Sequence, residues 1–245
     1  MAVRIVDVNV NFDIVHVHVS FLGCNRKWDV GIPSSVVIDD LWSRCALLDD
    51  GWHWWGATLE AMDADAWTRP TRLEGWDVSA LVAHHGLLVR GIAFLATQPL
   101  DAEPATTSAG DMLRRFNAPD GIANTGAEAV AEMARQQAAS ASREELTARF
   151  LVEAPPVVER VREAGPVVID YFGNGAFPIG EAVAIAIMES VVHGLDLADA
   201  IEAAGDLPGG PVRFTTELLA NLADPIDFIE SATGRRQPDV LPVLR

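Results

Sequence analysis

The segment from residue 179 to residue 204 constrains the fold of this 245-residue chain more than any other part of it. Apolar side chains cover nearly the whole circumference of the helix that it predicts, which is typical of a helix buried at the centre of a helical protein. Pro178 suits the first turn of this helix, and Gly205 suits its C-cap. Glu189 and His193 lie inside the apolar run and cost free energy to bury unless something pairs with them. A bound metal ion would remove that cost.

A second helix that carries histidine is expected over residues 78–97, where Asp77 supplies the N-cap and His84 and His85 fall within an apolar pattern. A glutamate and a histidine one helical turn apart, with a histidine from a facing helix, supply three of the four ligands that zinc usually takes. The fourth position would stay open, as it does in catalytic sites. The spacing can also arise by chance, and a histidine on an apolar face is often a hydrogen-bonded core residue. The residues alone leave that structural role open and do not choose between His84 and His85.

The other helices follow from apolar periodicity, capping residues and prolines. Ser34 or Ser35 is a fair N-cap for the first main helix, and Ser142 opens another through a Ser-x-x-Glu capping box. Pro155 and Pro156 should kink or split that helix, and the connection after it could contain a short extended piece. The main helices are expected at about 37–62, 78–97, 142–164 and 179–204, with shorter ones near 109–116, 125–139 and 212–222.

The first 36 residues follow a different pattern. Val8, Val10 and Phe12 alternate with polar residues, which predicts β-strands. His16 and His18 in this segment are better explained by surface alternation than by metal binding. The fold class is therefore all-α, a four-helix bundle with an N-terminal β-patterned appendage. The expected organisation is an appendage, extended or disordered, at 1–36, a helical bundle at 37–205, and a C-terminal helix and tail at 206–245.

The composition excludes some classes of function. A net charge of −17 argues against a nucleic-acid surface, because phosphate binding needs clustered lysine and arginine. No continuous apolar stretch is long enough to span a membrane, and the N-terminus lacks the features of a signal peptide. Cys24 and Cys45 match no disulfide framework and no common zinc pattern, so free thiols in a reducing cytoplasm are expected. Lys27 is the only lysine among 18 basic residues, which suits a GC-rich, actinobacterial genome.

Two motifs resemble those of a known family. Residues 76–84 read Trp-Asp-Val-x-x-Leu-Val-Ala-His, and residues 189–200 read Glu-x-x-Val-His-Gly-x-Asp-Leu-Ala-x-Ala. In these motifs the chain is similar to the actinobacterial mycothiol-dependent maleylpyruvate isomerase family. The resemblance covers about residues 38–205 and implies a DinB-like helical bundle with mycothiol as a thiol co-substrate. It also implies a divalent metal, with zinc expected, held by His84, Glu189 and His193.

The expected function combines an open zinc position with this resemblance. Such a zinc lowers the pKa of a bound thiol and polarises a carbonyl oxygen. We therefore expect a metal-dependent, thiol-cofactor transferase or isomerase that acts on a small electrophile, as a cytoplasmic monomer or homodimer. The alternatives are a non-catalytic metal-binding bundle that senses or binds a ligand, and a metal-free helical scaffold.

Three further residues are candidates for the site. Asp196 could accept the free ring N–H of a ligand histidine, or serve in a cap or a salt bridge. His85 could shuttle a proton, although its direction, about 100° around the helix from His84, favours a structural role. Arg90 could bind a carboxylate of the cofactor, or its charge could simply be solvated at the surface.

Two departures from the family pattern favour an electrophile other than maleylpyruvate. Maleylpyruvate isomerases carry a C-terminal α/β domain, for which the forty residues 206–245 are too few. Many relatives place an arginine one turn before the metal-binding glutamate, where this chain has Ala186. A thiol-transferase-like activity on another electrophile is therefore expected.

Overall fold

The computed structural model describes residues 3–11, 14–21, 24–33, 41–203, 206–235 and 243. The chain divides into two compact units, residues 1–39 and residues 40–245, and each is described by itself. The expected N-caps Ser34 and Ser35 and the expected C-cap Gly205 lie outside the described residues.

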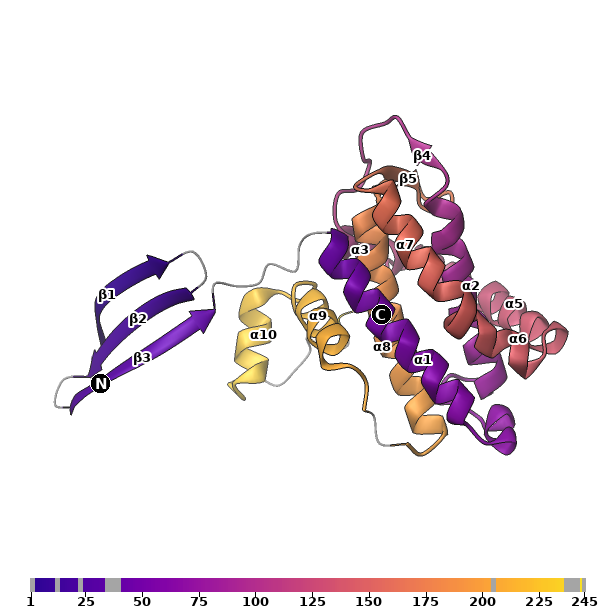
Figure 1. Cartoon of the computed structure of the whole chain (residues 1–245), viewed down its shortest axis with the longest axis horizontal. Helices are drawn as coiled ribbons and strands as arrows, with labels where there is room; N and C mark the ends of the chain where they lie inside the picture. Colours follow the sequence, from indigo (N-terminus) through magenta and orange to yellow (C-terminus); the bar gives the residue numbers. More distant parts are fainter. Residues whose placement is uncertain are drawn as a thin grey trace. The chain divides into compact units, whose positions relative to one another are not determined.

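The N-terminal unit contains an antiparallel sheet in the strand order β1-β2-β3 (Figure 1). Val8 pairs with Val17, and Val17 pairs with Val30 on the other side of the central strand. The alternating segments thus form the first two strands, whereas the third was not expected from the sequence. The strands are β1 (Val3–Asn11), β2 (Ile14–Phe21) and β3 (Cys24–Pro33).

Four helices form the bundle of the second unit (Figure 1). They are α1 (Leu41–Ala61), α2 (Val78–Leu95), α7 (Ala154–Ala164) and α8 (Ile179–Ala200). Both α7 and α8 pack against α1 and against α2, so the four helices enclose one core. The expected four-helix arrangement is confirmed.

Further elements surround the bundle. α5 packs against α2, and α9 packs against α8 and α1. These elements are η1 (Ala64–Thr68), α3 (Ala109–Phe116), α4 (Ile122–Thr125), α5 (Ala127–Ser140), α6 (Arg143–Ala148), α9 (Gly209–Ala220) and α10 (Pro225–Ala232).

The helix expected at 142–164 is divided in two. The capping box forms, since Ser142 Oγ accepts the Glu145 N–H and the Glu145 carboxylate accepts the Ser142 N–H. A wide π-helical turn, η2 (Arg149–Glu153), then separates α6 from α7. Proline lacks a backbone N–H and its ring clashes with the carbonyl four residues earlier, so Pro155 and Pro156 widen the turn that precedes them. The predicted interruption is confirmed.

α8 ends earlier than expected, at Ala200 instead of 204. The N–H of Ala203 bonds to the Ala198 carbonyl and the N–H of Glu202 bonds to the Asp199 carbonyl, the pair of bonds that defines a Schellman motif. Glu202, at φ 55°, occupies the left-handed position where glycine is usual. The expectation of a cap at Gly205 was therefore wrong by several residues.

A small antiparallel sheet lies beside the bundle, in the order β4-β5-β6. Its strands are β4 (Pro99–Leu100), β5 (Val168–Asp170) and β6 (Ala176–Pro178). The extended piece expected in the connection before α8 is thus present. The turn between β5 and β6 contains Phe172 at φ 52°.

α2 is long and apolar enough to cross a membrane by length and composition alone, with a mean hydropathy of 1.6 over its 18 residues. In this fold 56% of that window is buried inside the protein, where α2 packs against α1, α5, α7 and α8. α2 is therefore a core helix, and its burial explains its apolar composition.

Candidate metal centre

Three side chains from two helices meet at one point of the bundle. His84 comes from α2, whereas Glu189 and His193 come from α8. One ligand atom from each lies within 4.8 Å of the other two. A tetrahedral zinc with bonds of about 2.1 Å holds its ligands about 3.4 Å apart, so small side-chain shifts would let all three bind one ion. The donor set and its spacing fit a small divalent cation.

Local structure sets the direction of His84. Asp77 caps α2 by accepting the Ala80 N–H at 2.8 Å, which fixes the residue at which the helix begins. His84 then faces α8, with its ring centroid 5.2 Å from that of His193. The edge of the Trp76 indole contacts the other side, at 5.0 Å between centroids.

Two carboxylates hold the imidazole of His193. Its Nε2 lies 3.1 Å from Glu189 Oε2, and its Nδ1 lies 3.0 Å from Asp196 Oδ2. Asp196 is buried, and its other oxygen accepts a hydrogen bond from Arg72 Nε at 2.5 Å. When Nδ1–H donates to Asp196, the neutral form of the ring presents an unprotonated Nε2 to the centre.

The histidines of the cluster differ in protonation because their surroundings differ. Burial, followed by the nearby charge of His193, lowers the pKa of His84 to about 4. Burial also opposes the charge of His193, but hydrogen bonds to Asp196 and Glu189 outweigh it and raise the pKa of His193 to about 9. In the absence of metal, the His193 ring is therefore protonated at neutral pH, with one N–H facing Glu189 and the other facing Asp196. A cation would take the place of the proton on Nε2.

His85 points into the bundle core beside the cluster. Its ring stacks on Phe150 at 5.5 Å and lies 4.6 Å from the Trp55 ring. Burial, followed by the charges of His193 and His84, keeps the pKa of His85 well below its usual value, so the ring is neutral. Neither of its nitrogens has a hydrogen-bond partner within the described ranges. The ring centroid is 6.1 Å from that of His193.

Arg90 lies on another surface. Its guanidinium donates two hydrogen bonds to Glu153, at 2.8 and 2.7 Å, and its side chain is half-exposed. The structure brings His84, Glu189, His193 and Asp196 together, with His85 beside them, but it does not bring Arg90 to the cluster.

A cavity of about 590 Å³ reaches the cluster. His84, His85 and Glu189 line it, together with residues of α3, α4, α5 and the β5–β6 turn. Tyr171 belongs to that turn, and burial followed by the charge of Glu189 raises the pKa of its hydroxyl, which stays neutral. A small molecule in this cavity would lie against two of the three candidate ligands.

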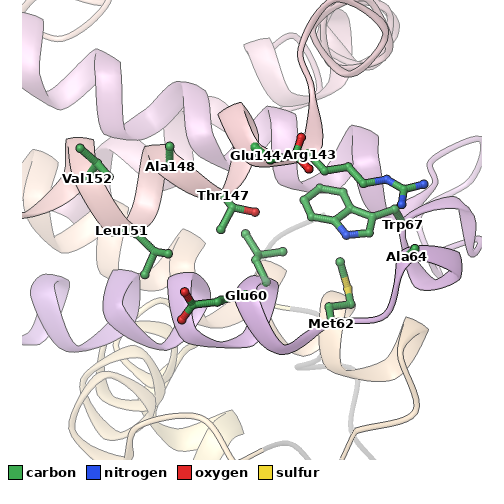
Figure 2. Close-up of a pocket in the computed structure, with 11 residues that line it drawn as sticks. Glu60, Met62, Ala64, Trp67, Arg143, Glu144, Thr147, Ala148, Leu151 and Val152 are labelled. Atoms are coloured by element: carbon green, nitrogen blue, oxygen red, sulfur yellow. The ribbon is translucent and has the colours of Figure 1, made fainter.

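A second hollow, of about 440 Å³, lies between α1, η1, α6 and η2 (Figure 2). Trp67 and Met62 line one end and Leu151 and Val152 line the other, as Figure 2 shows. The described residues that line it include no histidine and none of the predicted site residues. It offers no set of metal-binding groups comparable to the cluster.

Four residues near the cluster were missed by the sequence analysis, namely Arg72, Trp76, Tyr171 and Phe172. Arg72 contacts Asp196 across 124 positions of sequence, and no periodic pattern connects the two. Trp76 belongs to the first motif and could have been found there. Tyr171 and Phe172 lie in a segment that was expected only to be a connection.

Comparison with known proteins yields a family and a related structure. The family model described as the mycothiol maleylpyruvate isomerase N-terminal domain matches residues 48–198, a range that contains the whole cluster. A solved structure, the crystal structure of the mycothiol-dependent maleylpyruvate isomerase, is similar with a TM-score of 0.50 and 20% identity, over 76% of this chain and 70% of that chain. This likeness confirms the DinB-like helical fold. No curated protein matches the chain.

Proposed function

Because this chain belongs to the mycothiol maleylpyruvate isomerase N-terminal domain family, we propose that it is a metal-dependent enzyme that uses a mycothiol-type thiol on a small electrophile. The reaction is an isomerisation or a thiol transfer. The observation that carries the proposal is the cluster of His84, Glu189 and His193, two of which line an apolar cavity.

These three residues would hold one divalent ion through two imidazole nitrogens and one carboxylate oxygen. That donor set suits zinc, and it also suits nickel or iron. When bound, the metal would supply an open position at which a thiol loses its proton and becomes a nucleophile near neutral pH.

The neighbouring residues orient this set. Asp196 accepts a hydrogen bond from His193 Nδ1–H, which would leave Nε2 free for the ion, while Arg72 donates a hydrogen bond that holds the Asp196 carboxylate in place. The apolar walls of the cavity would exclude water from the reacting groups. Arg90 has no part in the proposal, since Glu153 already pairs with it.

His85 has two possible roles, of which the stacking on Phe150 favours the structural one. Replacement by phenylalanine separates them, because His85→Phe keeps the aromatic stack and removes both ring nitrogens. A variant that binds metal but loses turnover would support the proton-shuttle role. Retained turnover would leave His85 as a core residue.

Cobalt substitution tests the proposed function. Mycothiol added to the cobalt-loaded protein should produce a sulfur-to-metal charge-transfer band, and the protein should speed consumption of the thiol by a maleyl ester such as diethyl maleate. Glu189→Gln removes a negative ligand while keeping the shape of the side chain, and it should lose both effects. Glu60→Gln, at an exposed residue of the second hollow (Figure 2), should lose neither.

The enzyme proposal fails if cobalt binds but neither the spectrum nor the rate of thiol consumption changes. A non-catalytic metal-binding bundle would then be the better account.

A further inference from the structure

The cavity beside the metal centre is lined mainly by aliphatic and aromatic side chains. Its volume of about 590 Å³ is typical of a site for a small organic ligand. Ile122, Val130, Met133 and Phe172 line it and are still 37–51% exposed. Apolar surface left open beside a reactive centre indicates an occupant of similar character.

No lysine or arginine lines this cavity among the residues that the structure describes. Arg115, an exposed residue, contacts the lining residue Asn174 at its backbone oxygen (3.5 Å) and also contacts Thr106. Carboxylate recognition generally relies on bidentate arginine inside the site. The cavity wall offers no such partner.

The charge of the centre with its metal bound would also be balanced. A divalent ion would be balanced by the carboxylate of Glu189 and by a bound thiolate, which leaves no net positive charge to hold a dianion. An unpaired carboxylate buried against apolar walls carries a large desolvation cost. A ligand with two carboxylates would incur this desolvation cost for each of them.

Apart from the candidate metal ligand Glu189, the polar groups of the wall are neutral, and the donors of its two asparagine side chains are largely engaged. Asn117 Nδ2 donates to the Leu113 carbonyl at 2.9 Å, and Asn174 Nδ2 donates to the Tyr171 carbonyl at 3.0 Å. What remains for a ligand, besides the candidate metal-binding groups, is the neutral Tyr171 hydroxyl, the neutral His85 ring and the amide oxygens. These groups match an uncharged carbonyl or ester better than an anion.

The backbone places an aromatic ring at the cavity. Phe172 adopts φ 52°, an uncommon conformation for a bulky residue, and the hairpin turn that holds it is closed by a bond from the Gly175 N–H to Asp170 Oδ1. Its ring packs on Gly91, where an added Cβ would lie 2.8 Å from the ring. The strained turn and the close contact with Gly91 together hold the apolar Phe172 ring at the wall of the cavity.

From these observations we infer that the cavity takes an uncharged ligand with an apolar body, which is the electrophile of the reaction proposed above, and not a dicarboxylate. The inference rests on that proposed function for the role of the ligand. The chemical class of the ligand rests on the cavity wall and on the charge balance of the metal-loaded centre.

Binding to the metal-loaded full chain tests the class of ligand without turnover. The neutral fluorophore N-phenyl-1-naphthylamine should show saturable binding, and maleate should neither bind measurably by calorimetry nor displace it. Maleate that binds as tightly as the fluorophore would overturn the inference.

A charge placed in the cavity should reverse this preference. Met133 is exposed enough to be replaced without loss of the fold, and Met133→Arg should weaken fluorophore binding about tenfold and create measurable maleate binding. The matched control is Val152→Arg, which adds the same cation to an exposed apolar position of the second hollow (Figure 2) and should change neither. Equal weakening in both variants would place the fluorophore elsewhere and overturn the inference.

Turnover separates the inference from the proposed function. Diethyl maleate and maleate share one reactive double bond and differ in charge, and catalysed thiol consumption should be at least about tenfold faster with the diester. A faster reaction with the dianion would overturn the inference and leave the enzyme in place. If neither compound reacts while the fluorophore still binds, the proposed function fails, and the cavity remains a site for uncharged apolar ligands.

Discussion

The contacts of His193 decide what the candidate centre can bind. Its two ring nitrogens face Glu189 and Asp196, so in the proposed site Nδ1 would orient the ring and Nε2 would bind the metal. The helical spacing placed Glu189, His193 and Asp196 on one stripe of a helix, and the resemblance to the family, not the spacing alone, pointed to them as a site. Arg72 could not be predicted, because it contacts Asp196 from a loop and without any sequence pattern.

At the same scale, Asp196→Asn and Arg72→Gln should each weaken metal binding. Removal of a group that orients a ligand histidine typically costs 10- to 100-fold in metal affinity, and Asp196→Asn should cost more than Arg72→Gln because it contacts the ring directly. Competition with a chromophoric chelator measures the affinity. Arg69→Gln, at an exposed neighbouring arginine, is the control. Unchanged affinity in Asp196→Asn would show that this carboxylate does not orient the histidine.

Helices were predicted well wherever local rules decide them. The capping box at Ser142 and the proline pair at 155–156 act within one or two turns, and both have the expected effect. The end of α8 was missed because Glu202 takes a conformation that usually requires glycine. The short sheet of β4, β5 and β6 was mostly missed, since its strands of two or three residues carry no periodic signal.

Close packing between elements gives a prediction of its own. An added Cβ at Gly56 of α1 would lie 2.5 Å from Leu151 Cδ2 in η2. Gly56→Ala should gain about 1 kcal/mol of helix propensity but lose more through overpacking, for a net destabilisation of about 1–2 kcal/mol. Urea unfolding measures it, with Ala57→Ser on the exposed face of α1 as the control. A stabilised Gly56→Ala would mean that Leu151 moves aside at little cost.

For the whole molecule, the two compact units predict independent folding of the helical one. Deletion of residues 1–36 should leave a single cooperative unfolding transition for the bundle, because its core lies between its own helices. Circular dichroism during urea unfolding follows this transition. A deletion variant without a cooperative transition would show that the first 36 residues are part of the bundle's structure.

Metal should stabilise the folded chain as a whole. An ion that binds only the folded state, at a free concentration one hundred times its dissociation constant, adds about 2.7 kcal/mol, or about 5–10 °C in melting temperature for a chain of this size. A chelator should remove this increment from the wild type and have no effect on His193→Ala. Equal chelator effects on both proteins would argue that the stabilising ion binds elsewhere.

The central claim is that His84, Glu189 and His193 form a metal site, and metal content after purification tests it most directly. Elemental analysis should find about one divalent ion per chain in the wild type. It should find almost none in folded Glu189→Gln and His193→Ala, while His53→Ala, at an exposed histidine of α1, keeps its ion. Equal metal content in all four proteins, or none in the wild type after reconstitution, would contradict the account.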